Sequence, residues 1–164
     1  MAHDRVDLLR EMMSLRSDDP DGMDWFAPVS RALAGLTPAQ AAWLPASGVN
    51  TIWQIVNHLT FWTRFVARRL AGEAPTGTEI HNDETFGGPG DPLDADRWAR
   101  ALRELHDAYG ELEAVLAGQA DANLERQLTS RRTRAASLVG GSVMHDAYHI
   151  GQIVLLRKLQ GSWS

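Results

Sequence analysis

The apolar residues of this chain recur every three or four positions over long stretches, which is the period of an amphipathic α-helix. The clearest stretch begins near 91–94 and ends at Gly118, and its apolar residues are Trp98, Leu102, Leu105, Tyr109, Leu112 and Leu116. We find no alternation of apolar and polar residues that would indicate β-strands. The sequence therefore predicts an all-α fold, in one domain that covers residues 1–164.

Capping signals locate two of the expected helices. Thr37 and Thr51 each precede a glutamine by three residues, Gln40 and Gln54, which is the pattern of a capping box. We therefore expect a short helix after Thr37 and a long helix from Thr51 to about Ala71.

Two shorter helices are expected in the N-terminal part. The first runs from Asp4 to Met13 and ends before the turn-forming stretch SDDPDG. The second covers residues 24–36, with Pro28 in its first turn, where the missing N–H of proline costs nothing.

The last helix and one long connection complete the predicted architecture. Gly140–Gly141 and the candidate N-cap Ser142 predict a helix from there to about Leu159, apolar nearly all round and so buried on most sides. The connection, residues 72–92, is rich in glycine and proline and long enough to join helices that are not nearest neighbours. We therefore predict a four-helix bundle with a long crossover connection.

The composition excludes several classes of site. The chain has no cysteine, which excludes disulfides, cysteine-type zinc sites and a thiol nucleophile of its own. Its net charge of -5 gives no basic footprint for nucleic acid, and Arg131, Arg132 and Arg134 fit a solvated loop. We expect a cytoplasmic protein without a membrane partner, because the N-terminus lacks the apolar core of a signal peptide and no apolar run approaches the ~18 residues of a membrane span.

Three histidines are the candidate metal ligands. His145 and His149 are four residues apart, so they share one face of the last helix and could converge on one divalent ion. Without a metal, each of these rings would need its own hydrogen-bond partners in a buried helix. His58 taken alone fits a core histidine, but together with the pair it offers a third ligand from a facing helix.

Asp146 and Gln152 are the candidate catalytic residues. The stretch HDAYH is similar to the zincin motif H-E-x-x-H with Asp146 in place of the glutamate, although Asp146 also fits the first turn of the helix, where it would complement the helix dipole. Gln152 could bind a water on the metal or fill a gap in the core. The histidines that fit a metal site less well are His3, His81 and His106. The aromatic residues that fit either the core or a pocket wall are Phe61, Trp62, Phe65 and Tyr148.

Three stretches, GLTPAQAAWLP, TIWQIVNHLTFW and MHDAYHIGQIVLLRKLQG, resemble the DinB/YfiT-like superfamily, and with their spacing they cover most of the chain from about residue 23. The resemblance implies a four-helix bundle with a long crossover and a metal triad of His58, His145 and His149. It also implies zinc or nickel as the usual metal, a homodimer, and either a thiol-dependent S-transferase or a metal-dependent hydrolase.

Three functions follow as hypotheses. The first is a metal-dependent S-transferase, in which a low-molecular-weight thiol binds the metal as thiolate and attacks a small electrophile. The second is a hydrolase whose metal-bound water is oriented by Asp146 or Gln152. The third is a metal-stabilised binding or stress protein without catalysis. Imidazole ligands suit zinc, nickel, copper or iron and do not choose among them.

Overall fold

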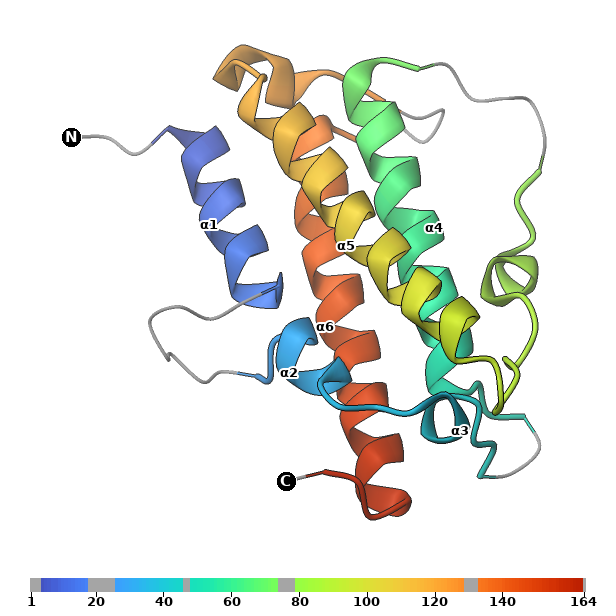
Figure 1. Ribbon diagram of the computed structural model, residues 1–164. Helices are drawn as coiled ribbons and strands as arrows, with labels where there is room; N and C mark the ends of the chain where they lie inside the picture. The colour runs from blue at the N-terminus through green and yellow to red at the C-terminus, as the bar shows by residue number, and fades with distance from the viewer. Residues whose placement is uncertain (1–3, 18–25, 46–47, 74–78, 129–132, 164) are drawn as a thin grey trace.

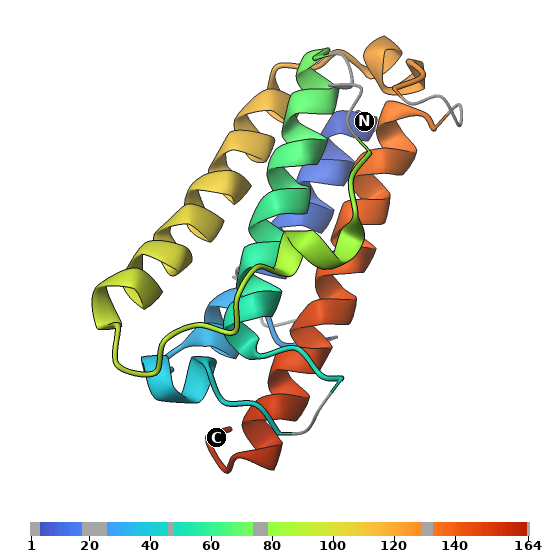
Figure 2. The ribbon, with the colours of Figure 1, turned by 90° about the vertical axis from the view of Figure 1, so that its right-hand side faces the viewer.

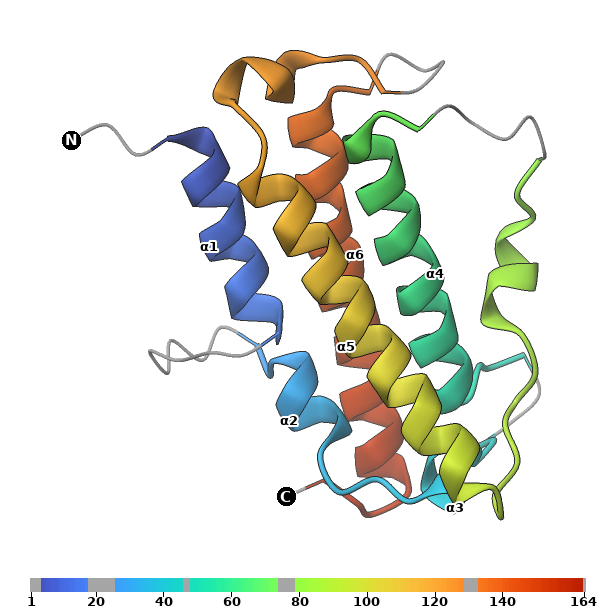
Figure 3. The ribbon, with the colours of Figure 1, turned by 45° about the horizontal axis from the view of Figure 1, so that its top comes forward.

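The computed structural model describes five stretches of the chain, residues 4–17, 26–45, 48–73, 79–128 and 133–163. Within them the regular structure is helical, apart from one isolated β-bridge. The long helices lie side by side as a bundle in Figures 1 and 3, and they are α1 (Arg5–Ser17), α4 (Ile52–Ala71), α5 (Ala95–Ala117) and α6 (Ala135–Leu159). This arrangement confirms the predicted all-α bundle. No helix in the described stretches is both long and apolar enough to cross a membrane.

Shorter helices close the ends of the bundle and interrupt its connections. Helices α2 (Val29–Leu33) and α3 (Pro38–Ala41) lie near the C-terminal end of α6. Two 3-10 turns complete the set, η1 (Asn82–Phe86) in the connection between α4 and α5, and η2 (Asp121–Glu125) between α5 and α6. The predicted connection 72–92 therefore contains a short helix of its own.

Both predicted capping boxes are present. At the start of α4, the Thr51 hydroxyl accepts from the backbone N–H of Gln54, and the Gln54 side chain accepts from the backbone N–H of Thr51. The same reciprocal pair links Thr37 and Gln40 at α3. These caps satisfy backbone donors that a helix start leaves free, so they fix where α3 and α4 begin.

The long crossover is also confirmed. Helices α4 and α5 run in the same direction in Figure 1, from the α3 end of the bundle to the opposite end, so the chain must return along the bundle between them. The length of such a connection also allowed it to join helices that are not nearest neighbours. Instead, α4 and α5 pack on each other more extensively than any other pair of elements.

The N-terminal boundaries differ from the prediction. Helix α1 continues to Ser17 rather than ending at Met13, and α2 is only the short helix Val29–Leu33. Pro28 is the N-cap of α2 rather than a residue of its first turn. Most of the expected turn SDDPDG lies outside the described residues.

The start of α6 was also predicted wrongly. The helix begins at Ala135, and Gly140, Gly141 and Ser142 lie inside it. Its start is fixed by a backbone bridge between Gln127 and Arg134, and the Ser142 hydroxyl donates to the Val139 carbonyl within the helix. Packing of the flanking residues outweighs the roughly 1 kcal/mol that each glycine costs in a helix interior.

Two clusters of buried side chains form the core, one at each end of the bundle. In α4, the buried apolar residues between 52 and 59 belong to the cluster near α2 and α3, and those between 66 and 70 belong to the cluster that includes α1. In α6, residues 150–156 and 135–143 divide in the same way. His58 of α4 and the pair His145 and His149 of α6 therefore lie between the two clusters.

Candidate metal centre

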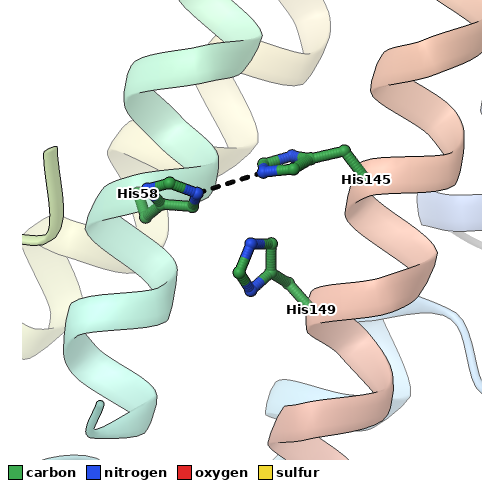
Figure 4. Close-up of side chains that lie close together, drawn as sticks. All are labelled: His58, His145 and His149. Carbon is green, nitrogen blue, oxygen red and sulfur yellow. Dashed lines mark hydrogen bonds between the residues drawn. The ribbon is translucent and has the colours of Figure 1, made fainter. Parts of the chain in front are cut away.

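The three predicted ligands come together between α4 and α6. His58 is almost completely buried at 2% exposure, and His149 is buried at 6%. The side chain of His145 is half-buried, at 32% exposure, and it gives the cluster an edge toward solvent. Figure 4 shows the three rings turned toward one another, one from α4 and two from successive turns of α6.

The spacing of the ring nitrogens suits one metal ion. Nε2 of His58 lies 3.0 Å from Nε2 of His145, and one candidate nitrogen from each of the three residues lies within 4.8 Å of the others. Two nitrogens bound at 2.0–2.1 Å to one tetrahedral zinc ion would lie about 3.3 Å apart. Small ring movements would therefore bring all three nitrogens to bonding distance, and this buried cluster could hold a divalent metal.

His58 and His149 each have a hydrogen-bond partner on the nitrogen that points away from the cluster. Nδ1 of His58 is 2.5 Å from the Thr85 hydroxyl, and the Nδ1–H of His149 donates to Oε1 of Gln152 at 2.7 Å. Nδ1 of His145 lies 3.6 Å from a carboxylate oxygen of Asp146. Outer partners of this kind orient metal-binding histidines and set their tautomers.

Burial favours the neutral form of two of the rings, which is the form that binds metal. Burial first, and then the nearby His149 and His145, lower the pKa of His58 from its usual 6.5 to about 3. Burial lowers the pKa of His149 as well, while its hydrogen bond to Gln152 acts in the opposite direction.

The predicted catalytic residues both lie beside the cluster. Asp146 is 1% exposed and lies more than two turns inside α6, so the alternative position in the first turn of the helix is wrong. Gln152 lies on the same helix one turn after His149 and contacts its outer nitrogen. Both residues therefore face the outer nitrogens of the histidines rather than the point where the three rings meet.

The other histidines do not join the cluster. His81 and His106 are exposed, and neither belongs to the group of possible ligands found among the described residues. His3 lies outside the described residues, as do Arg131 and Arg132.

The aromatic candidates divide between the cluster and a neighbouring cleft. The ring of Tyr148 contacts that of His149 edge-on at 5.0 Å between centroids, and Trp62 approaches His58 in the same manner at 6.3 Å. Phe61 and Phe65 instead line a cleft of about 780 Å³ between α4 and the connection that follows it. This volume is in the range that accommodates a small molecule.

Two residues at the cluster were missed by the sequence analysis. Thr85 and Phe86 both come from η1, which lies against α4 in Figure 2. Phe86 stacks on His58 with 3.9 Å between ring centroids and 9° between planes. Residues 72–92 have no periodicity, so no local pattern could have brought this pair to the histidines.

One comparison with known proteins gives a match. The family model of the DinB superfamily matches residues 27–153, a range that includes all three clustered histidines. The chain belongs to the DinB superfamily. No curated protein and no solved structure matches the chain. Membership of the DinB superfamily thus confirms the resemblance seen in the sequence, while the activity rests on the site itself.

Proposed function

We propose that this DinB-superfamily protein is a divalent-metal-dependent enzyme of the thiol S-transferase type, with zinc or nickel as its metal. The observation that carries the proposal is the convergence of His58, His145 and His149, with His145 half-exposed to solvent. Three protein ligands leave at least one position on a metal for another molecule, whereas closed structural sites use four. A bound ion of this kind acts as a Lewis acid and lowers the pKa of a thiol that it holds.

The proposed reaction takes its nucleophile from outside the protein. The chain has no cysteine, so a low-molecular-weight thiol must supply the sulfur. The sulfur forms a bond to an electrophilic carbon of a small substrate, the leaving group departs with its electron pair, and the thiol proton passes to solvent. The protein orients His58 through Thr85 and His149 through Gln152, and it excludes water from the buried side of the site.

Hydrolysis is the alternative, and the placement of Asp146 argues against it. A hydrolase of the zincin type needs a carboxylate that reaches the attacking water. Asp146 is 1% exposed and lies beside the outer nitrogen of His145, while Gln152 is engaged with His149. Thiol transfer needs no such base, because a metal ion itself favours the thiolate.

A non-catalytic, metal-stabilised protein is the third possibility. Such a protein has no need of a ligand-sized cavity beside the metal. The cleft of about 780 Å³ that Phe61 and Phe65 line lies next to the cluster, and Thr85 stands between the two. A ligand-sized cleft one residue away from the cluster favours a small-molecule-binding protein over a purely structural one, although none of the three histidines lines this cleft.

An assay of thiol consumption tests the proposal. The protein is loaded with Zn²⁺ or Ni²⁺ and mixed with glutathione, cysteine or coenzyme A and chlorodinitrobenzene as electrophile. We expect faster thiol loss with the wild type than with His149→Ala, and an unchanged rate with His106→Ala, which removes an exposed imidazole that is not part of the cluster. Turnover of esters without any thiol would favour hydrolysis instead. No thiol loss with any of the three thiols would count against a transferase.

Elemental analysis tests the metal itself. We expect about one divalent ion per chain in the wild type and in His106→Ala, and loss of most of it in His58→Ala, because three ligands are the minimum for a stable site of this kind. Equal metal content in all three proteins would place the ion elsewhere.

We also propose that the protein is a homodimer, paired through an exposed face of α6. Met144, Tyr148 and Leu155 are 73%, 65% and 56% exposed, and with Gly151 they follow one another at intervals of four, three and four residues. This spacing is typical of a seam between two paired helices. A second copy of the same helix offers the same apolar seam, as a two-fold symmetric interface requires.

A further inference from the structure

Polar side chains of α4 hold the segment that follows η1. The Thr51 hydroxyl donates to the Pro89 carbonyl at 2.9 Å, and Gln54 Nε2 donates to the Gly87 carbonyl at 3.1 Å. The Asn57 amide donates to the carbonyl of Phe86 at 3.1 Å. These three bonds lie along one side of α4 and continue toward His58. They fix the backbone after η1, and so place Thr85 at the outer nitrogen of His58.

The contacts of the Thr85 hydroxyl assign the tautomer of His58. Oγ1 of Thr85 lies 2.6 Å from the Asn82 carbonyl oxygen and 2.5 Å from Nδ1 of His58. Two oxygens this close repel each other unless a hydrogen lies between them, so the single hydroxyl hydrogen points to Asn82, whose carbonyl only accepts. The proton between Thr85 and His58 must then belong to Nδ1. The lone pair of His58 is consequently on Nε2, the nitrogen that faces His145.

A second contact from η1 fixes the plane of the same ring. Phe86 stacks on His58 nearly parallel, at 9° and 3.9 Å between centroids. Thr85 and Phe86 are both 8% exposed, so water does not compete effectively for either contact. Consecutive residues of η1 thus fix the rotation and the protonation pattern of one imidazole.

We propose that Thr85 is a positioning residue of the metal centre, which holds His58 as the Nδ1–H tautomer and so presents Nε2 as a ligand. This inference rests on the proposed metal site and gives the long connection between α4 and α5 a role at that site. Without the hydroxyl, Nδ1 of His58 would lose the acceptor that it has in this structure. The ring could then protonate on Nε2 instead, and that proton would have to leave before a metal binds.

The test compares two threonines of the same region. Thr85→Val keeps the size and branching of the side chain and removes the hydroxyl, whereas Thr85→Ser keeps the hydroxyl. The matched control is Thr60→Val, because Thr60 lines the same cleft and is buried at 7%, yet its hydroxyl donates to the Val56 carbonyl of its own helix. Affinity for Zn²⁺ is measured by competition with a chromophoric chelator. Separately, the nitrogen-15 shifts of the imidazoles in the metal-free protein report the tautomers near neutral pH.

We expect Thr85→Val to weaken Zn²⁺ binding by about 10–100-fold, the usual cost of losing an outer partner of a metal-binding histidine. Thr85→Ser and Thr60→Val should bind close to the wild-type affinity. The metal-free wild type should show His58 protonated on Nδ1, and Thr85→Val should lose that preference.

The outcomes separate this inference from the proposed function. If the wild type binds no Zn²⁺, the metal centre itself is wrong and the role of Thr85 falls with it. If the wild type binds Zn²⁺ and Thr85→Val binds it equally well, or if His58 is protonated on Nε2 in the wild type, only the role of Thr85 is overturned.

Discussion

The backbone of Gly90 rests directly on the indole ring of Trp53. A Cβ atom added to residue 90 would come within 2.5 Å of Cε3 of that ring, and the residue has a positive φ of 94° that other residues rarely adopt. Trp53 is itself buried at 2% exposure and packs against Trp98 with 5.1 Å between ring centroids. The end of the connection between α4 and α5 thus packs on the core at a position where only glycine fits.

Gly90→Ala should therefore destabilise the protein. We expect a loss of about 2–4 kcal/mol in the free energy of unfolding, because overpacking and backbone strain add at this residue. Gly88→Ala is the matched control, since a Cβ at Gly88 meets nothing within 4 Å, and it should change stability by no more than about 0.5 kcal/mol. Urea unfolding of both variants measures the difference. Equal stabilities would show that the backbone at residue 90 can move away from the Trp53 ring without cost.

The metal-free protein should lose stability in mild acid. The pKa of His58 is lowered to about 3 by burial and by its neighbouring histidines, whereas the unfolded chain has the usual value of 6.5. Below the unfolded value, the unfolded state binds a proton that the folded state does not. The contribution of His58 is therefore complete above pH 6.5 and declines as the pH falls toward the folded pKa.

Unfolding of the chelator-treated protein measures this effect. We expect a loss on the order of 2 kcal/mol between about pH 7 and pH 5 from His58 alone. His58→Gln should remove most of that dependence, whereas His106→Gln, which changes an exposed histidine, should keep it. An unchanged pH dependence in His58→Gln would assign the acid sensitivity to other groups.

Gln152 should act on metal affinity rather than on the reaction alone. Its Oε1 accepts a hydrogen bond from Nδ1–H of His149 at 2.7 Å, which orients that ring. We expect Gln152→Leu to weaken Zn²⁺ binding by about tenfold or more, and Gln152→Glu to retain it, because a carboxylate also accepts from the imidazole. Chelator competition gives the affinity. A lower rate at unchanged affinity would instead support the catalytic role that the sequence suggested.

The oligomeric state should depend on the exposed face of α6. Leu155→Glu places a charge at the C-terminal end of the proposed seam and should convert a dimer to a monomer in light scattering after gel filtration. Leu93→Glu is the matched control, because Leu93 is a single leucine that is 91% exposed and lies outside α6. A wild type that is monomeric at micromolar concentrations would refute the dimer.

Local patterns predicted most of the helices correctly and put His145 and His149 on one helical face. The capping boxes at Thr37 and Thr51 are local hydrogen-bond motifs, so neighbouring residues suffice to identify them. The start of α6 could not be found in this way. It depends on a bridge between Gln127 and Arg134 and on packing that keeps Gly140 and Gly141 helical.

The sequence by itself determined an all-α bundle with a long crossover, and it placed His145 and His149 on one helical face, because a helix puts residues four apart next to each other. Only the tertiary structure decided that His58 meets them, that α4 and α5 lie in contact, and that Thr85 and Phe86 return to cover the His58 ring. The physical reason is that periodicity and capping act within a few residues of chain. Contacts between residues 58, 85 and 145 depend on how whole helices pack. Because the connection 72–92 has no periodicity, neighbouring residues do not predict which helix it contacts.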